Sequence, residues 1–200
     1  IGGKSHPADD SGKILIQQLV RFSRDPKVRG RIVFLPDYDI TLAKTLYPGC
    51  DVWLNNPLRP LEACGTSGMK AALHGGLNLS VLDGWWDEWY DGENGWAIPT
   101  ADTASSDEER DDAEASALYD LIEHQLVPKF YDREGGIPLG WLGMVRHTMT
   151  ELGKKATSDR MVQDYVTRLY VPASEHEAAL RADGFAEAKA LAAFTSRVRD

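Results

Sequence analysis

Apolar side chains in the first hundred residues follow two alternating patterns. One is a repeat at helical spacing, seen first where Ile14, Leu15, Leu19 and Phe22 recur after the polar residue Ser11. Residues three or four positions apart share one face of a helix, so we expect a helix that starts at Ser11 or a neighbour.

The second pattern is a short segment rich in apolar residues, which is typical of strands. Three such segments predict strands at residues 31–35, 51–54 and 77–82. Ile1 is expected to end a further strand, and a helix is expected to open at Asp39 or Thr41 and to end at Pro48 and Gly49. Short strands that are each followed by a helix of about ten residues predict an α/β fold with a doubly wound, Rossmann-like parallel sheet.

The second half of the chain reads as helical. An acidic stretch, residues 100–112, predicts a solvated loop and a helix start. Three apolar stripes follow at helical spacing and are expected to cover the sheet: Leu118, Leu121, Ile122 and Leu126; Trp141, Val145, Met149 and Leu152; Met161, Val162, Tyr165, Val166 and Leu169. We therefore divide the chain into a partial Rossmann-like domain at 1–106, its helical continuation at 107–172, and a helical tail at 173–200.

Composition and charge exclude several function classes. The formal net charge of -9 argues against nucleic acid as a partner, because phosphate backbones are bound by concentrated Lys and Arg. No apolar run approaches the roughly 18 residues that a membrane span needs. The two cysteines and five histidines show no spacing typical of a metal site, so no metal is expected.

The nine residues from Glu62 to Lys70 carry the candidate chemistry. They follow a predicted strand and contain a small-residue loop, a helix start near Thr66 and one lysine, and the helix is expected to end near His74. Free backbone N–H groups of Thr66, Ser67 and Gly68 at such a helix start would bind an anion such as phosphate.

Lys70 lies one helical turn after Thr66, and its side chain is expected to lean back toward the anion site. An amine beside a phosphate pocket suits pyridoxal phosphate, whose aldehyde condenses with lysine. On spacing alone the alternative stays open that Lys70 is an ordinary solvated helix lysine and Thr66 an ordinary helix cap.

Several ordered motifs resemble one family. The segments 1–7 (IGGKSHP), 34–39 (FLPDYD), 53–70 (WLNNPLRPLEACGTSGMK) and 78–88 (NLSVLDGWWDE) closely resemble the α-glucan (glycogen, starch or maltodextrin) phosphorylases, most of all their shorter prokaryotic branch. The resemblance is good to about Ile98 and fainter beyond Asp107. It places the chain in the C-terminal half of a two-Rossmann-domain glycosyltransferase architecture, so that the chain is expected to be a fragment.

The resemblance assigns roles residue by residue. Lys70 occupies the position of the family's Schiff-base lysine. Thr66 and Ser67 occupy the positions whose backbone amides bind the cofactor phosphate. The family's loop that holds the reacting sugar corresponds to Glu62, Ala63, Cys64 and Gly65. The resemblance implies that Glu62 accepts hydrogen bonds from sugar hydroxyls. Familiar animal members carry serine at the Cys64 position and asparagine at the Gly68 position, so two contacts differ here.

The reaction that the resemblance implies is cleavage of an α-1,4-glucan by inorganic phosphate to α-glucose 1-phosphate with retained configuration. Pyridoxal 5'-phosphate acts there through its phosphate group, as a proton relay, in a cytoplasmic enzyme whose full-length form can be a homodimer. Because the family's upstream basic motif and N-terminal domain are absent from these 200 residues, the isolated fragment is expected to be inactive. Two alternatives remain: a nucleotide-sugar-dependent glycosyltransferase of the glucan synthase type, and a non-catalytic glucan-binding fragment.

Aromatic residues gather just after the last predicted strand, at Trp85, Trp86, Trp89, Tyr90 and Trp96. Flat aromatic faces can stack on sugar rings, but the spacing of Trp85 and Trp89 is also that of a short helix packed on a sheet. We favour core packing.

Overall fold

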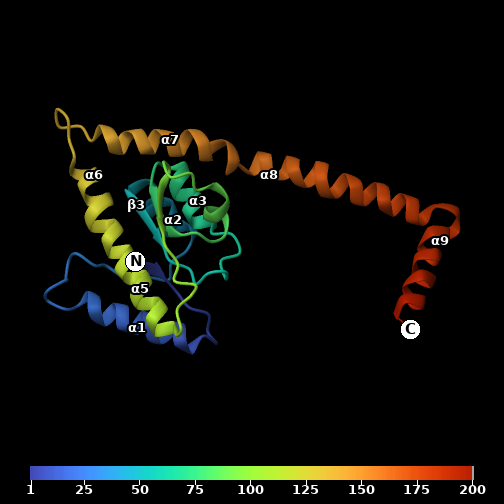
Figure 1. The fold of residues 1–200 in the computed structure, drawn as a ribbon, viewed down its shortest axis with the longest axis horizontal. Coiled ribbons are helices and arrows are strands. Elements are labelled where there is room, and N and C mark those ends of the chain that lie inside the picture. The colour runs from blue at the N-terminus through green and yellow to red at the C-terminus, as the bar shows by residue number, and fades with distance from the viewer. Residues whose placement is uncertain (200) are drawn as a thin grey trace.

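The computed structural model describes residues 1–199, which form an α/β body and a long helical arm (Figure 1). The first half alternates strands and helices: β1 (Gly2–Gly3), α1 (Asp10–Ser23), β2 (Leu35–Pro36), α2 (Ile40–Gly49), β3 (Val52–Asn55), α3 (Thr66–Leu73), β4 (Leu77–Val81), α4 (Trp85–Trp89) and β5 (Gly95–Ile98). The second half is helical: α5 (Asp107–Leu121), η1 (Ile122–Leu126), α6 (Val127–Tyr131), α7 (Leu139–Lys155), α8 (Ser158–Tyr165), η2 (Val166–Tyr170) and α9 (Val171–Arg199).

All strand pairs in the described residues are parallel, in two separate sheets. One sheet pairs β1 with β2, and the other has the order β3-β4-β5. The predicted α/β class with parallel strands is therefore confirmed, and the expected single sheet is here divided in two.

The predicted strand at 31–35 is wrong in its bounds, because only Leu35 and Pro36 pair as β2. Within the ladder, Gly2 lies opposite Leu35 and Gly3 opposite Pro36. The strand β5 (Gly95–Ile98) was missed, because it starts with a glycine directly after the turn-forming residues 91–94 and was not distinguished from that turn.

The core lies around β4, whose five residues are all buried. Leu77, Leu79 and Val81 pack with Trp96, Ile98 and Trp141, and partly buried side chains of α5, η1 and α7 close over them. A central parallel strand is buried on both faces, so the polar residues Asn78 and Ser80 are buried together with the apolar ones.

Helix starts follow the capping residues. Asp39 accepts a hydrogen bond from Leu42 N at 2.9 Å before α2, and Ser106 accepts one from Glu109 N at 3.2 Å before α5. Side chains of this kind satisfy backbone donors that a helix leaves without partners. The acidic stretch is thus a loop followed by a helix start, as predicted.

Trp85 and Trp86 are buried, with 5% and 1% of their surface exposed. They pack with Ala72 and Leu152, and Trp86 Nε1 donates to Trp96 O at 3.3 Å. These two rings therefore belong to the core, as predicted, and not to an open sugar platform.

The third apolar stripe does not cover the sheet, contrary to the prediction. α8, η2 and α9 run away from the body as an arm (Figure 1), and Met161, Val162 and Leu169 are 41%, 52% and 55% exposed. The helical tail is present but α9 is interrupted at 182–185, where the backbone leaves helical geometry. Of that predicted tail, residue 200 lies outside the described part. Among residues 1–199, no helix combines the length and the apolar character that crossing a bilayer requires.

Candidate functional site

The segment from Glu62 to Lys70 lies where the sheet topology places ligands. It follows the carboxyl end of β3, and α3 begins at Thr66 and gives way to His74, as the sequence predicts. In parallel α/β sheets, loops beyond the carboxyl ends of the strands form the binding crevice.

Gly65 makes the sharp entry into α3. It caps the helix with φ of 90°, a left-handed conformation that favours glycine. A Cβ on Gly65 would lie 2.9 Å from Trp85 Cδ1, so the ring of Trp85 closes directly over the loop. Both backbone conformation and packing therefore require glycine at this position.

Asp83 ties the predicted sugar loop to the core. Its side chain is 9% exposed, its Oδ2 accepts from Glu62 N at 2.9 Å, and its Oδ1 accepts from Gly84 N at 2.9 Å. Trp85 N donates to Cys64 O at 2.9 Å, which fixes the same loop from the other end. A buried carboxylate that accepts two backbone N–H groups is a strong, oriented anchor.

The carboxyl group of Glu62 lies over the loop. Glu62 is half-buried, and its Cδ is 3.7 Å from the place that a Cβ on Gly65 would take. Ala63 and Cys64 are exposed between these two residues, and Cys64 is a free thiol. The loop thus presents a carboxylate and small side chains to solvent, a combination that can accept hydrogen bonds from hydroxyl groups.

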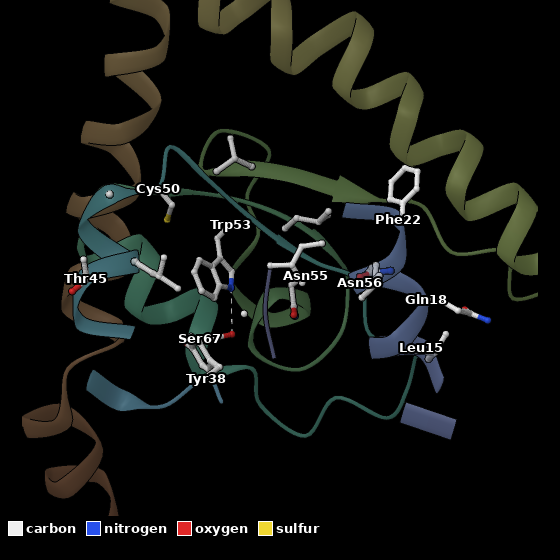
Figure 2. A pocket seen from close by; sticks show the side chains of 17 residues that line it. Leu15, Gln18, Phe22, Tyr38, Thr45, Cys50, Trp53, Asn55, Asn56 and Ser67 are labelled. Carbon is white, nitrogen blue, oxygen red and sulfur yellow. Dashed lines mark hydrogen bonds between the residues drawn. The ribbon is translucent and has the colours of Figure 1, made fainter. Parts of the chain in front are cut away.

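The start of α3 offers two of the three predicted amide donors. Thr66 and Ser67 occupy the first two positions of the helix, whose N–H groups have no acceptor within it. The amide of Gly68 differs from the prediction: its N–H donates to Gly65 O at 3.2 Å, because the helix begins with a tight turn. Ser67 Oγ accepts from Trp53 Nε1 at 3.3 Å, so its side chain faces β3 (Figure 2).

Gly68 packs against a buried amide. Asn78, which is 1% exposed, donates from Nδ2 to Gly68 O at 3.1 Å, and its Oδ1 would lie 2.6 Å from a Cβ on Gly68. Asn78 therefore occupies the space that a side chain at position 68 would need. This contact explains how the chain accommodates glycine where animal phosphorylases have asparagine.

Lys70 is exposed one turn after Thr66 on the same helix. The ring of His74 bonds to Lys70 O at 2.8 Å, and since a carbonyl only accepts, His74 Nδ1 carries the proton. In the described residues, no group of three His, Cys, Asp or Glu side chains could hold a metal ion.

The structure brings Glu62, Gly65, Thr66 and Ser67 together around one loop and helix start. Sequence reasoning missed three contacts that shape it: Asp83 with Glu62 N, Asn78 with Gly68 O, and Trp53 with Ser67 Oγ. Each joins residues at least ten positions apart, so no local pattern could predict the pairing.

Comparison with known proteins finds a matching family model and several similar sequences. Residues 1–91 match the family model described as carbohydrate phosphorylase. The whole chain is 59% identical to a glycogen phosphorylase of Mycobacterium tuberculosis and covers 23% of that protein. It is 47% identical over 84% of its length to a glycogen phosphorylase of Aquifex aeolicus, covering 24% of it, and 37% identical over 98% to a maltodextrin phosphorylase of Thermococcus litoralis, covering 23%.

The chain therefore spans about a quarter of the length of these relatives. The resemblance drawn from the motifs is confirmed by sequence identity over the full 200 residues. Over its length the chain is thus similar in sequence to a segment of the carbohydrate phosphorylases.

Proposed function

We propose that this chain is the cofactor-bearing part of an α-glucan phosphorylase. The proposal rests on the start of α3. There the free backbone amides of Thr66 and Ser67 lie about one turn before the exposed Lys70, and the loop that carries the Glu62 carboxylate precedes them in the chain. The same segment falls within the residues that match the phosphorylase family.

Pyridoxal 5'-phosphate fits the residues that are present. The amides of Thr66 and Ser67, at the positive end of the helix dipole, would bind its phosphate, and the amine of Lys70 would bind its aldehyde. When bound, this cofactor would supply a phosphate group able to exchange a proton with inorganic phosphate.

The loop 62–65 would bind the reacting sugar. Glu62 would accept hydrogen bonds from its hydroxyls, while the small residues Ala63, Cys64 and Gly65 allow the backbone to approach it closely. Asp83 would keep this loop rigid, and a site held in its productive geometry lowers the cost of reaching the transition state.

In the whole protein, we propose phosphorolysis of an α-1,4-glucan to α-glucose 1-phosphate. The similarity to a glycogen phosphorylase and to a maltodextrin phosphorylase supports this class of substrate. We further propose that residues 1–106 belong to one doubly wound domain of a two-domain enzyme, that 107–172 continue it, and that 173–200 form a tail.

Cofactor binding is tested on the 200-residue chain. Incubation with pyridoxal phosphate followed by borohydride should give a stable adduct, which peptide mass spectrometry should locate at Lys70. The Lys70→Arg variant should form no adduct. The control variant Lys44→Arg, which alters a lysine of α2, should form it as the parent chain does. An adduct spread over several exposed lysines, or equally strong in Lys70→Arg, would refute the assignment. Binding of a nucleotide sugar without any adduct would instead favour the glycosyltransferase alternative.

A further inference from the structure

A cavity of about 380 Å³ lies at the edge of the three-stranded sheet that is opposite to the Glu62–Lys70 segment. Its lining residues come from the turn before β5, from β5 itself, from η1 and α6, and from α7. The Glu62–Lys70 segment follows the carboxyl end of β3, whereas the cavity borders Gly95 and Trp96 at the amino end of β5. Because β3, β4 and β5 are parallel, the cavity is separate from the proposed cofactor site.

The turn before β5 forms one wall of the cavity and is fastened to α7. His147 Nε2 lies 2.7 Å from Asp91 Oδ2, and Thr148 Oγ1 donates to Asn94 O at 3.1 Å. Within the turn, Glu93 N donates to Asp91 Oδ1 at 2.9 Å. The backbone of this wall is therefore fixed before any ligand binds, which lowers the entropic cost of binding, and both Glu93 and His147 line the cavity.

Lys129 of α6 lines the cavity with an amine that has no ionic partner. It is half-buried, and among residues 1–199 no carboxylate lies within ion-pair distance of its amine. Its Nζ lies 3.9 Å from the place that a Cβ on Gly140 would take. Gln125, four residues earlier in the π-helical turn η1, lines the same cavity, and such turns are frequent at functional sites. The amine and the amide can therefore both donate hydrogen bonds to oxygen atoms of a ligand.

Two glycines of α7 keep the cavity open. Gly140, Gly143, Met144 and His147 follow one face of the helix, and all four line the cavity. A Cβ on Gly143 would meet no atom within 4 Å, and its backbone is helical, so neither packing nor conformation requires glycine there. Glycine in a helix interior is nevertheless less stable than alanine. Gly143 therefore keeps free a space that the fold itself does not use.

The charges that line the cavity are balanced. Lys129 and Glu93 carry opposite charges, and His147 is paired with Asp91. The carboxylates oppose an anion and the amine opposes a cation, whereas a hydroxyl group can donate to a carboxylate and accept from an amine. The half-buried ring of Tyr90 adds an apolar surface. A volume near the lower end of the range of about 300–1,000 Å³ for ligand pockets suits a neutral ligand of one or two sugar rings.

We propose that this cavity is a second carbohydrate site, which binds one or two glucosyl units of an α-1,4-glucan away from the reacting end. Lys129 and Gln125 would bind sugar hydroxyls from one wall and Glu93 and His147 from the other, with the sugar ring over Gly143. For the identity of the sugar, this proposal rests on the proposed function, whose substrate is a polymer of such units. A polymer held at a second place stays at a higher effective concentration near the first.

Titration of the isotope-labelled 200-residue chain with maltotriose, followed by NMR, tests the second site. The backbone amides of Gly92, Gly140 and Gly143 should shift progressively and saturate with a dissociation constant in the millimolar range. Inorganic phosphate, added alone, should leave these three amides unchanged, because the site has no excess of positive charge. The amide of Gly65 reports the proposed sugar loop separately in the same spectra.

Matched substitutions on α7 give an independent readout. Gly143→Leu should fill the cavity and abolish the maltotriose shifts of Gly92 and Gly140. Gly153→Leu is the control, because a Cβ on Gly153 also meets open space but this residue does not line the cavity. Lys129→Met keeps the length of the side chain, removes the amine and should weaken binding by about tenfold or more. This second variant serves for the comparison if Gly143→Leu does not fold.

Several results would overturn the second site. These are shifts at Gly65 without shifts at Gly140 and Gly143, equal shifts with phosphate alone, and equal losses in Gly143→Leu and Gly153→Leu. A chain that forms the pyridoxal phosphate adduct at Lys70 but shows no maltotriose shifts at the cavity would overturn this site alone. Shifts at the cavity in a chain that forms no adduct would support this site and refute the proposed cofactor site, so the two failures are distinguishable.

Discussion

At the scale of single residues, the candidate site depends on side chains that the Glu62–Lys70 motif does not contain. Asn78 lies in β4 and Asp83 lies just after its carboxyl end, and both are buried. Each fixes backbone atoms of the motif, Glu62 N and Gly68 O respectively. The geometry of the loop is therefore as sensitive to these two residues as to its own.

Asp83→Asn should loosen the loop. The substitution replaces one acceptor oxygen with an N–H₂ group, and the backbone amide of Glu62 or Gly84 then loses its charged partner, at a cost of about 1.5–3 kcal/mol. Urea unfolding would measure the loss, and faster exchange of the Glu62 amide would locate it. Asp87→Asn, at a half-exposed carboxylate on α4, should change neither measurement by more than a small amount.

Gly68→Asn should destabilise the chain, because the new side chain meets Asn78 Oδ1 and the ring of Trp85. Overpacking of this kind costs about 1–3 kcal/mol. Combining it with Asn78→Ala should recover part of the loss, which a double-mutant cycle of unfolding free energies would detect. Gly143→Asn on α7, where a Cβ meets open space, is the control; strictly additive effects at 68 and 78 would contradict the proposed contact.

At the scale of elements, α7 holds the connection between α4 and β5. Thr148 Oγ1 donates to Asn94 O at 3.1 Å, and His147 Nε2 lies 2.7 Å from Asp91 Oδ2. The hydrogen bond to Asp91 raises the pKa of His147, opposed by partial burial and supported by the charges of Asp91, Glu93 and Glu151. Burial alone would raise the pKa of Asp91, but the hydrogen bonds from His147 and from Glu93 N outweigh it and hold that pKa below its usual value.

This pair should make stability depend on pH. Because the folded state raises the pKa of His147, its contribution is full below the usual value of 6.5 and is lost as pH rises through the raised value. The contribution of Asp91 is present above its usual 3.8 and is lost as pH falls through the lowered value. The interaction should therefore be strongest in the mildly acidic range between these values.

His147→Gln should accordingly lower the melting temperature more at about pH 5.5 than at about pH 8.5, with a difference of about 1–2 °C because the pair is partly exposed. Thermal unfolding followed by circular dichroism measures this. His176→Gln on α9 is the control and should show the same small effect at both pH values. A larger effect of His147→Gln at the higher pH would contradict the assignment.

The sequence predicted helix starts well, because capping and turn residues close to the helix determine where it begins. The start of α3 at Thr66, the cap Asp39 before α2 and the start of α5 at Asp107 all follow from local capping and turn residues. It failed at the strand 31–35 and at β5, because strand bounds depend on the partner and not on the segment itself. The first and last residues of a strand are thus harder to predict from the sequence than the start of a helix.

At the scale of the whole molecule, the arm formed by α8, η2 and α9 leaves an apolar stripe open to solvent (Figure 1). The stripe consists of Met161, Val162, Tyr165, Val166 and Leu169, each between 40% and 55% exposed. Contiguous exposed apolar surface of this kind marks an interaction site.

Replacing Val162 and Leu169 with lysine should measurably reduce the binding of a hydrophobic dye, because two of the five side chains of the stripe are removed. The melting temperature should stay within about 2 °C of the parent chain, since neither side chain packs on the core. Dye fluorescence and thermal unfolding test the two halves of this prediction. Leu139→Lys, at the start of α7, is the control; a large drop in melting temperature from the α8 and η2 changes would show that the arm is packed after all.

Capping, turn chemistry and apolar periodicity act over a few residues, so the amino-acid sequence predicts the class of the fold, the helix starts and the Glu62–Lys70 segment. The distant residues that anchor this segment, and the contact by which Asn78 fills the space beside Gly68, are visible in the three-dimensional structure alone. The same is true of the division of the strands into two separate sheets. Contacts across the sheet depend on how strands and helices are arranged in space, and no short-range pattern encodes that arrangement.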